Sequence, residues 1–142
     1  MERAGMRTAY SLHCMEAQPF ESKRVLVVDD DAWLRPVLAE LLADEGYDVA
    51  EAESGSQALH QIRQWCPDVV VLDMALPWRS GLAVLDELKA DERTRRLPII
   101  LVSGKVDLAG TARAHRVAAA LHKPLDFGAL LSKVALSVRP AA

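Results

Sequence analysis

The apolar residues of this chain fall into two patterns that alternate along it. Continuous runs rich in valine and isoleucine occupy 25–28, 69–72 and 98–102. Short continuous runs of this composition predict strands that are buried on both faces. Weaker apolar segments at 47–52 and 117–121 predict two further strands.

Between the runs, apolar residues recur three and four positions apart, which is the spacing of one helix face. Asp31 is the predicted N-cap of the first helix and Gly46 its C-cap, while Pro36 must lie near the first turn. A cap is also expected at Asp126. The predicted helices run over 32–45, from 54–56 to Pro67, over 82–90 and 108–115, and from Asp126 to about 138.

Five repeats of strand then helix predict an α/β fold with three layers, in which helices cover both faces of a parallel five-stranded sheet. Residues 1–22 show no periodicity and are interpreted as a flexible N-terminal extension. Residues 23–138 then form one domain, and 139–142 are a C-terminal tail.

Four of the predicted strands run into polar residues of definite chemistry: Asp29 and Asp30, then Asp73, Ser103 and Lys123. In a parallel sheet the carboxyl ends of the strands meet at one edge, where ligands bind. The acidic residues repel one another unless a cation intervenes, so a hard metal such as Mg²⁺ is expected among them. The alternative is that these are unrelated solvated loop residues, and four compatible groups at one edge disfavour it.

Charge and composition narrow the classes of function. With 142 residues and a net charge of −3, the chain gives no electrostatic reason to expect nucleic-acid binding. It contains no apolar run of membrane-spanning length and no secretory signal pattern, so we expect no membrane contact and a cytoplasmic location. Cys14 and Cys66 are too few for a disulfide framework, and reduced thiols are predicted.

Four segments together resemble the receiver domain of two-component response regulators, the CheY-like family. They are VLVVDDD at 25–31, PDVVVLDMALPWRSG at 67–81, PIILVSG at 98–104 and HKPLD at 122–126. They occur in the family's order and cover about residues 23–138. The resemblance implies a flavodoxin-like, doubly wound sheet.

The resemblance assigns Asp73 as the residue that accepts a phosphoryl group from a histidine kinase or phosphotransfer protein. It implies that Asp30 binds Mg²⁺ (or Mn²⁺) directly, that Asp29 holds it mostly through water, and that Asp73 and the backbone carbonyl of Ala75 complete the site. Asp31 is kept as a helix cap outside the metal site. Self-catalysed phosphorylation and dephosphorylation are the only chemistry expected, so the chain is not interpreted as an enzyme.

Three further residues are implied to handle the phosphoryl group. Ser103 matches the hydroxyl that binds its oxygens, Gly104 leaves room for it, and Lys123 matches the lysine that pairs with it. The bond before Pro124 matches one that is usually cis in the family.

The sequence departs from the family pattern around its fourth helix. Ala120 stands where the family usually has an aromatic switch residue, and the span from Ser103 to Lys123 looks about two residues short. The leading interpretation is a stand-alone receiver that changes a contact with an unidentified protein partner, with a homodimer compatible. The alternative is an interaction module that works without phosphorylation.

A Mg²⁺-dependent phosphatase of the haloacid dehalogenase type would also use a strand-end aspartate. That family requires a second aspartate two positions after the nucleophile, where this chain has Ala75, so the motif disfavours this function.

Two tryptophans are predicted near the same sheet edge. Trp33 lies just after the acidic run, and Trp78 lies in the loop after Asp73. Each is interpreted either as a partner contact or as a cover for apolar side chains.

Overall fold

The computed structural model describes residues 22–104 and 108–138. The strands are β1 (Arg24–Val28), β2 (Asp48–Ala52), β3 (Val69–Asp73), β4 (Ile99–Ser103) and β5 (Ala119–His122). The helices are α3 (Leu34–Asp44), α4 (Gly55–Trp65), α5 (Gly81–Ala90), α6 (Leu108–His115) and α7 (Phe127–Ser137). The predicted extension over 1–22 and the tail over 139–142 fall, apart from residue 22, outside the described residues.

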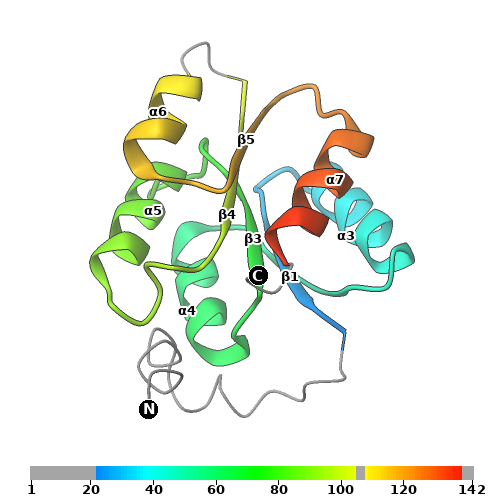
Figure 1. Ribbon diagram of the computed structural model, residues 1–142, viewed down its shortest axis with the longest axis horizontal. Helices are drawn as coiled ribbons and strands as arrows, with labels where there is room; N and C mark the ends of the chain where they lie inside the picture. The colour runs from blue at the N-terminus through cyan, green and yellow to red at the C-terminus, as the bar shows by residue number, and fades with distance from the viewer. Residues whose placement is uncertain (1–21, 105–107, 139–142) are drawn as a thin grey trace.

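All neighbouring strands pair in parallel, in the order β2-β1-β3-β4-β5. Helices α3 and α7 cover one face of the sheet, and α4, α5 and α6 cover the other (Figure 1). The order reverses between β1 and β3, and the crevice at such a reversal is where doubly wound sheets bind ligands. The three-layer, flavodoxin-like fold predicted from the sequence is therefore confirmed.

The core explains why the continuous apolar runs form the central strands. β3 and β4 are buried along their whole lengths, because each face of these strands meets a helix layer. Leu26, Leu72 and Leu101 face one apolar cluster, while Val27 and Ile100 face the other. Burial on both faces leaves no position for a polar side chain until the strand ends.

Local capping chemistry sets the helix boundaries close to the predicted ones. The N-cap of α3 is Trp33, whose side chain makes no capping bond, so the prediction of Asp31 as the cap lies two positions too early. The carboxylate of Asp31 instead closes the turn before the helix, where it accepts hydrogen bonds from the backbone N–H groups of Trp33 (2.8 Å) and Leu34 (3.0 Å). Pro36 then lies in the first turn of α3, where its missing N–H costs little. Gly46 follows the helix at φ +98°, and Asp126 caps α7 through the N–H of Ala129.

The prediction of reduced cysteines differs from the structure. Cys66, which follows α4, is disulfide-bonded, so the prediction of a reduced thiol is wrong for this residue. The only other cysteine, Cys14, lies outside the described residues. Cys66 follows a helix with no neighbouring cysteine whose spacing would indicate a disulfide. No helix within 22–104 and 108–138 is long and apolar enough to cross a membrane.

Candidate metal centre

Two strand ends bring three carboxylates together at one edge of the sheet. Asp29 and Asp30 follow β1, and Asp73 is the last residue of the adjacent β3. One oxygen from each carboxylate lies within 4.8 Å of the others. Asp29 and Asp73 are each only 3% exposed, whereas Asp30 faces solvent. The sequence correctly predicts this convergence.

Lys123 reaches into the same cluster from the end of β5. Its Nζ donates to Asp29 Oδ2 and to Asp73 Oδ2, each at 3.2 Å. Burial raises the pKa of the Asp73 carboxyl, and the neighbouring Asp29 raises it further. Burial alone would lower the pKa of the Lys123 ammonium, but the two carboxylates raise it above its ordinary value. Lys123 therefore holds two buried carboxylates that would otherwise repel each other.

The donor set fits a divalent cation. Three carboxylates and one ammonium leave a formal charge of −2 at the cluster, which one Mg²⁺ would neutralise. Ligands around an octahedral Mg²⁺ lie about 3 Å apart when adjacent and about 4.2 Å apart when opposite. The three carboxylate oxygens, all within 4.8 Å of one another, lie close enough together to share one such ion.

The loop after β1 is held by contacts that the sequence analysis did not identify. Asp29 Oδ1 accepts from the backbone N–H of Asp31 at 2.9 Å. Arg35 donates from Nη1 to the carbonyl of Asp29 at 2.9 Å and forms ion pairs with Glu51 and Glu53 of the neighbouring strand and loop. Arg35 thus fixes the orientation of Asp29. No sequence motif marks this contact, and only the position of Arg35 in the first turn of α3 places it near the loop.

Gly81 is a second residue whose role was not apparent from the sequence, which indicates only a turn at this position. A Cβ placed there would lie 2.2 Å from the carbonyl oxygen of Asp73 and 2.6 Å from the Cα of Met74. The N–H of Gly81 donates to the carbonyl of Met74 at 2.9 Å. The start of α5 therefore lies directly on the backbone of the predicted phosphoacceptor, which any larger residue would displace.

The residues predicted to handle a phosphoryl group lie around the cluster. Ser103 is buried at the end of β4, and its carbonyl accepts from the backbone N–H of Lys123 at 2.9 Å. Gly104 is exposed and has open space where a side chain would stand. The N–H of Ala75 donates to Asp73 Oδ1 at 3.1 Å. The Lys123–Pro124 peptide bond is cis, as expected.

The region of the predicted fourth helix is short but regular. α6 spans Leu108–His115, as the sequence predicts. Ala120 lies opposite Leu101 in the sheet and packs, half-buried, against the apolar cluster under α4 and α5. With only a methyl group, Ala120 has no side chain that could move between an inward and an outward position.

Both tryptophans at this edge are exposed. Trp33 is 71% exposed and Trp78 is 98% exposed. The interpretation that each covers apolar side chains is therefore wrong for Trp78. For Trp33 it holds only to a small extent, because less than a third of the residue is buried. Trp78 also has φ +61°, a left-handed conformation that favours glycine. Neither observation is explained by the packing of the domain itself.

Comparison with known proteins agrees with this geometry. Residues 25–135 match the response regulator receiver domain family. The chain belongs to this family. One similar protein is the DNA-binding response regulator MtrA of Mycobacterium tuberculosis, which is 42% identical to this chain over 85 residues. These residues are 60% of this chain and 36% of MtrA. The transcriptional regulatory protein PdtaR of M. tuberculosis is 33% identical over 117 residues, 82% of this chain and 57% of PdtaR.

Solved structures show the same fold. The receiver domain of NtrX from Brucella abortus superposes with a TM-score of 0.75 at 30% identity, covering 82% of this chain and 99% of that domain. The chain spans about a third of the length of MtrA and just over half of the length of PdtaR. Receiver domains are phosphoacceptors of two-component systems, and they bind Mg²⁺ at an acidic pocket of the kind that Asp29, Asp30 and Asp73 form here.

Proposed function

We propose that this receiver accepts a phosphoryl group on Asp73 from the phosphohistidine of a histidine kinase or phosphotransfer protein. The observation that carries the proposal is the Asp73 carboxylate, buried at a strand end with Oδ2 on Lys123 and Oδ1 on the N–H of Ala75. A carboxylate held in this way is oriented for attack on phosphorus. The new P–O bond forms as the bond between phosphorus and the donor nitrogen breaks, which leaves an aspartyl phosphate and a free imidazole.

The remaining residues have distinct parts in this reaction. Lys123 balances charge on the transferring phosphoryl oxygens, and the hydroxyl of Ser103 donates a hydrogen bond to them. Gly104 leaves the approach open. Asp30, Asp29, Asp73 and the carbonyl of Ala75 would hold a divalent cation. When bound, Mg²⁺ (or Mn²⁺) neutralises negative charge on the phosphoryl oxygens and on the carboxylates.

The test uses a small phosphodonor. Purified protein is incubated with acetyl phosphate, with and without Mg²⁺, and its intact mass is measured under conditions that preserve acyl phosphates. The expected result is one phosphoryl group per chain, only with the metal, and none in Asp73→Asn. An adduct of equal extent in Asp73→Asn would overturn the assignment of Asp73, and absence of any adduct would overturn the proposed activity.

The output proposed for this receiver is a changed contact with a protein partner. The chain would then act as a cytoplasmic phosphoacceptor, without enzymatic turnover beyond its own phosphorylation and dephosphorylation. A homodimer is compatible with this output. The exposed Trp33 and Trp78 beside the acidic cluster support a protein surface at this edge.

A second candidate is an interaction module that works without phosphorylation. Ala120 favours it, because this half-buried methyl group cannot report a movement of Ser103 as a large aromatic side chain would. Backbone NMR of the phosphorylated and unphosphorylated protein separates the two. Shift changes across 108–122 support a working switch, whereas changes confined to the neighbourhood of Asp73 support the second candidate.

A further inference from the structure

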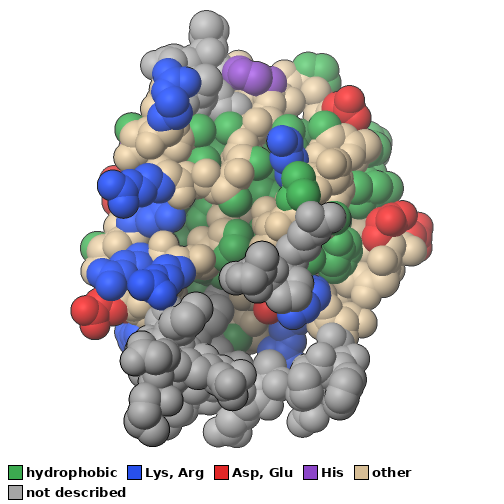
Figure 2. All heavy atoms as spheres, viewed as in Figure 1, with side chains coloured by type: hydrophobic (Ala, Val, Ile, Leu, Met, Phe, Trp, Pro, Cys, Tyr) green, Lys and Arg blue, Asp and Glu red, His purple; other side chains and the backbone are tan. Residues whose placement is uncertain are grey.

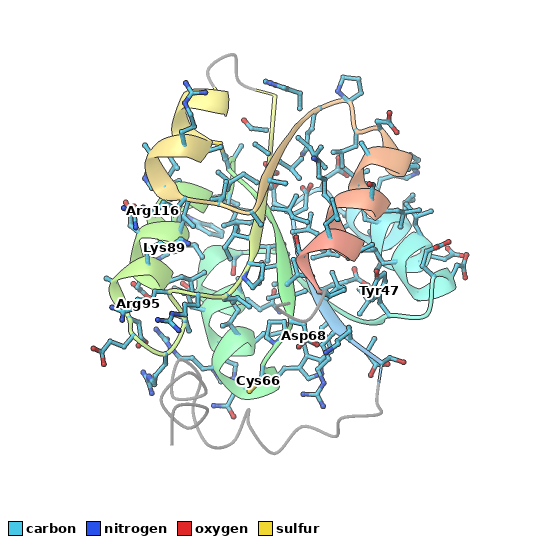
Figure 3. The ribbon with its side chains drawn as sticks, viewed as in Figure 1. Tyr47, Cys66, Asp68, Lys89, Arg95 and Arg116 are labelled. Atoms are coloured by element: carbon cyan, nitrogen blue, oxygen red, sulfur yellow. The ribbon has the colours of Figure 1, made fainter. Side chains whose placement is uncertain are left out.

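A cationic pocket lies at the edge of the sheet opposite the acidic cluster. It is a hollow of about 410 Å³ between the end of α5, the loop before β4 and the end of α6. Six residues line it: Lys89, Arg95, Arg96, Ala114, His115 and Arg116. In Figure 3 the labelled Lys89, Arg95 and Arg116 lie together between α5 and α6. Figure 2 shows several Lys and Arg side chains gathered along this side of the molecule, at left.

The positive charges of this pocket are mostly unpaired. Within the described part of the chain, no carboxylate pairs with the side chains of Arg95, Arg96 or Arg116, and only His115 meets one, Asp86, at 3.2 Å. Other surface arginines pair with carboxylates: Arg35 with Glu51, Arg63 and Arg79 with Glu87, and Arg93 with Asp91. The pocket therefore gathers several cations without carboxylate partners in a chain whose net charge is −3.

The backbone beneath the pocket is fixed by Lys89. Its Nζ donates to the carbonyls of Arg95 and Arg116, each at 3.2 Å, and so ties the loop before β4 to the end of α6. Arg116 is held at φ +53°, in the left-handed region. Burial lowers the pKa of the Lys89 ammonium, and the charge of Arg116 lowers it further. The fold thus keeps like charges close together at an energetic cost.

The pocket's chemistry indicates the class of ligand. Guanidinium groups form paired hydrogen bonds to phosphate oxygens, and three arginines converge here from two segments. The imidazole of His115, which meets Asp86, is the one ring among the lining residues, and the apolar lining is limited to Ala114 and side-chain stems. A hollow of about 410 Å³ accommodates a compact ligand better than a long polyanion. A compact ligand with several phosphate groups fits best.

We propose that Lys89, Arg95, Arg96 and Arg116 form a binding site for a small anion that carries two or more phosphate groups. The site is separate from the acidic cluster that holds Asp73, and it requires neither phosphorylation nor a metal. Bound there, the anion neutralises the four cations and links the loop before β4 to the end of α6.

To test this, inorganic triphosphate is titrated into metal-free protein at low ionic strength. Binding is measured by calorimetry and by backbone NMR. Metal is removed with a chelating resin, because a soluble chelator is itself a polyanion. We expect saturable binding with shift changes at 95–97 and 114–118, and binding of inorganic monophosphate at least about tenfold weaker, since it meets fewer of the cations. Asp73→Asn should bind triphosphate as the natural chain does, which separates this site from the proposed function.

Matched variants distinguish a built site from general charge attraction. Arg95→Gln with Arg96→Gln should weaken triphosphate binding by about tenfold or more. Arg63→Gln with Arg93→Gln removes the same charge outside the pocket and should change affinity less than about twofold. Arg116→Gly suits the left-handed backbone, so it keeps the fold while also weakening binding.

Four results would overturn the proposal, and the first three concern triphosphate itself. These are no saturation at millimolar triphosphate, equal losses in the two arginine pairs, or shift changes that map elsewhere on the domain. Binding of hexaglutamate as tight as that of triphosphate would also overturn it, because the pocket would then recognise acidic protein segments in place of phosphate groups.

Discussion

Replacing Lys123 by methionine removes the ammonium that bridges Asp29 and Asp73 while keeping most of the apolar length of the side chain. Each Nζ–Oδ2 distance is 3.2 Å. At an effective dielectric constant of about 20, each contact corresponds to roughly 5 kcal/mol of Coulomb attraction before desolvation is subtracted. Breaking a fully buried pair costs about 3–5 kcal/mol. Because the Lys123 side chain is 28% exposed, we expect a smaller loss of unfolding free energy, about 2 kcal/mol.

Thermal unfolding by circular dichroism measures this loss in metal-free buffer and in saturating Mg²⁺. A loss of about 2 kcal/mol lowers the melting temperature of a domain of this size by roughly 8 °C. In Mg²⁺ the cation compensates for the missing ammonium, so the difference between variant and natural protein should shrink to less than about half. Lys133→Met, on the exposed side of α7, is the matched control and should change stability by less than about 0.5 kcal/mol.

Two results would refute this reasoning. If Lys123→Met melts like the natural protein without metal, the bridging ammonium does not hold the two carboxylates together. If Mg²⁺ raises both melting temperatures equally, the metal and Lys123 do not act on the same carboxylates.

The remaining predictions concern the metal, the partner surface and the backbone at the site. Asp30→Asn should weaken Mg²⁺ affinity by about tenfold or more in a fluorescence or calorimetric titration. Asp31→Ala removes only the hydrogen bonds to the N–H groups of Trp33 and Leu34; it should leave that affinity within about twofold and lower the melting temperature slightly. Trp78→Gly should stabilise the fold by up to about 1 kcal/mol in urea unfolding, because glycine suits the left-handed backbone. If Trp78 contacts the protein partner, the same substitution should slow phosphorylation by a phosphohistidine protein but not by acetyl phosphate. Gly81→Ala should cost about 3 kcal/mol by the same urea assay, because its Cβ would overlap the backbone of Asp73; unchanged stability would show that α5 can shift freely.

The sheet was predictable because its central strands are buried on both faces. The runs ending at Asp29, Asp73 and Ser103 have no polar position until the strand stops, so strand ends and candidate site residues coincide in the sequence. Parallel pairing then placed these residues at one edge without further information. The capping residue Asp126 fixed the start of α7 through a local hydrogen bond that is also visible in sequence. Asp31 fixed the turn just before α3 in the same way, while the N-cap itself fell on Trp33.

The features that the sequence did not reveal depend on contacts between distant segments. Arg35 has no motif that marks its hydrogen bond to the carbonyl of Asp29, because the bond depends on how α3 enters the loop. The close approach of Gly81 to β3 appears only once α5 is packed on the sheet. The cationic pocket joins residues around 89, 95 and 116, and nothing in their spacing predicts that they meet.

The central claim, that Asp73 accepts the phosphoryl group, is tested most directly by locating the acyl phosphate. Protein phosphorylated with acetyl phosphate and Mg²⁺ is reduced with borohydride, which converts an aspartyl phosphate to homoserine, and peptides are then mapped by mass spectrometry. We predict homoserine at position 73 alone, absent when Mg²⁺ is omitted. Modification at Asp29 or Asp30 with position 73 unchanged would contradict the account.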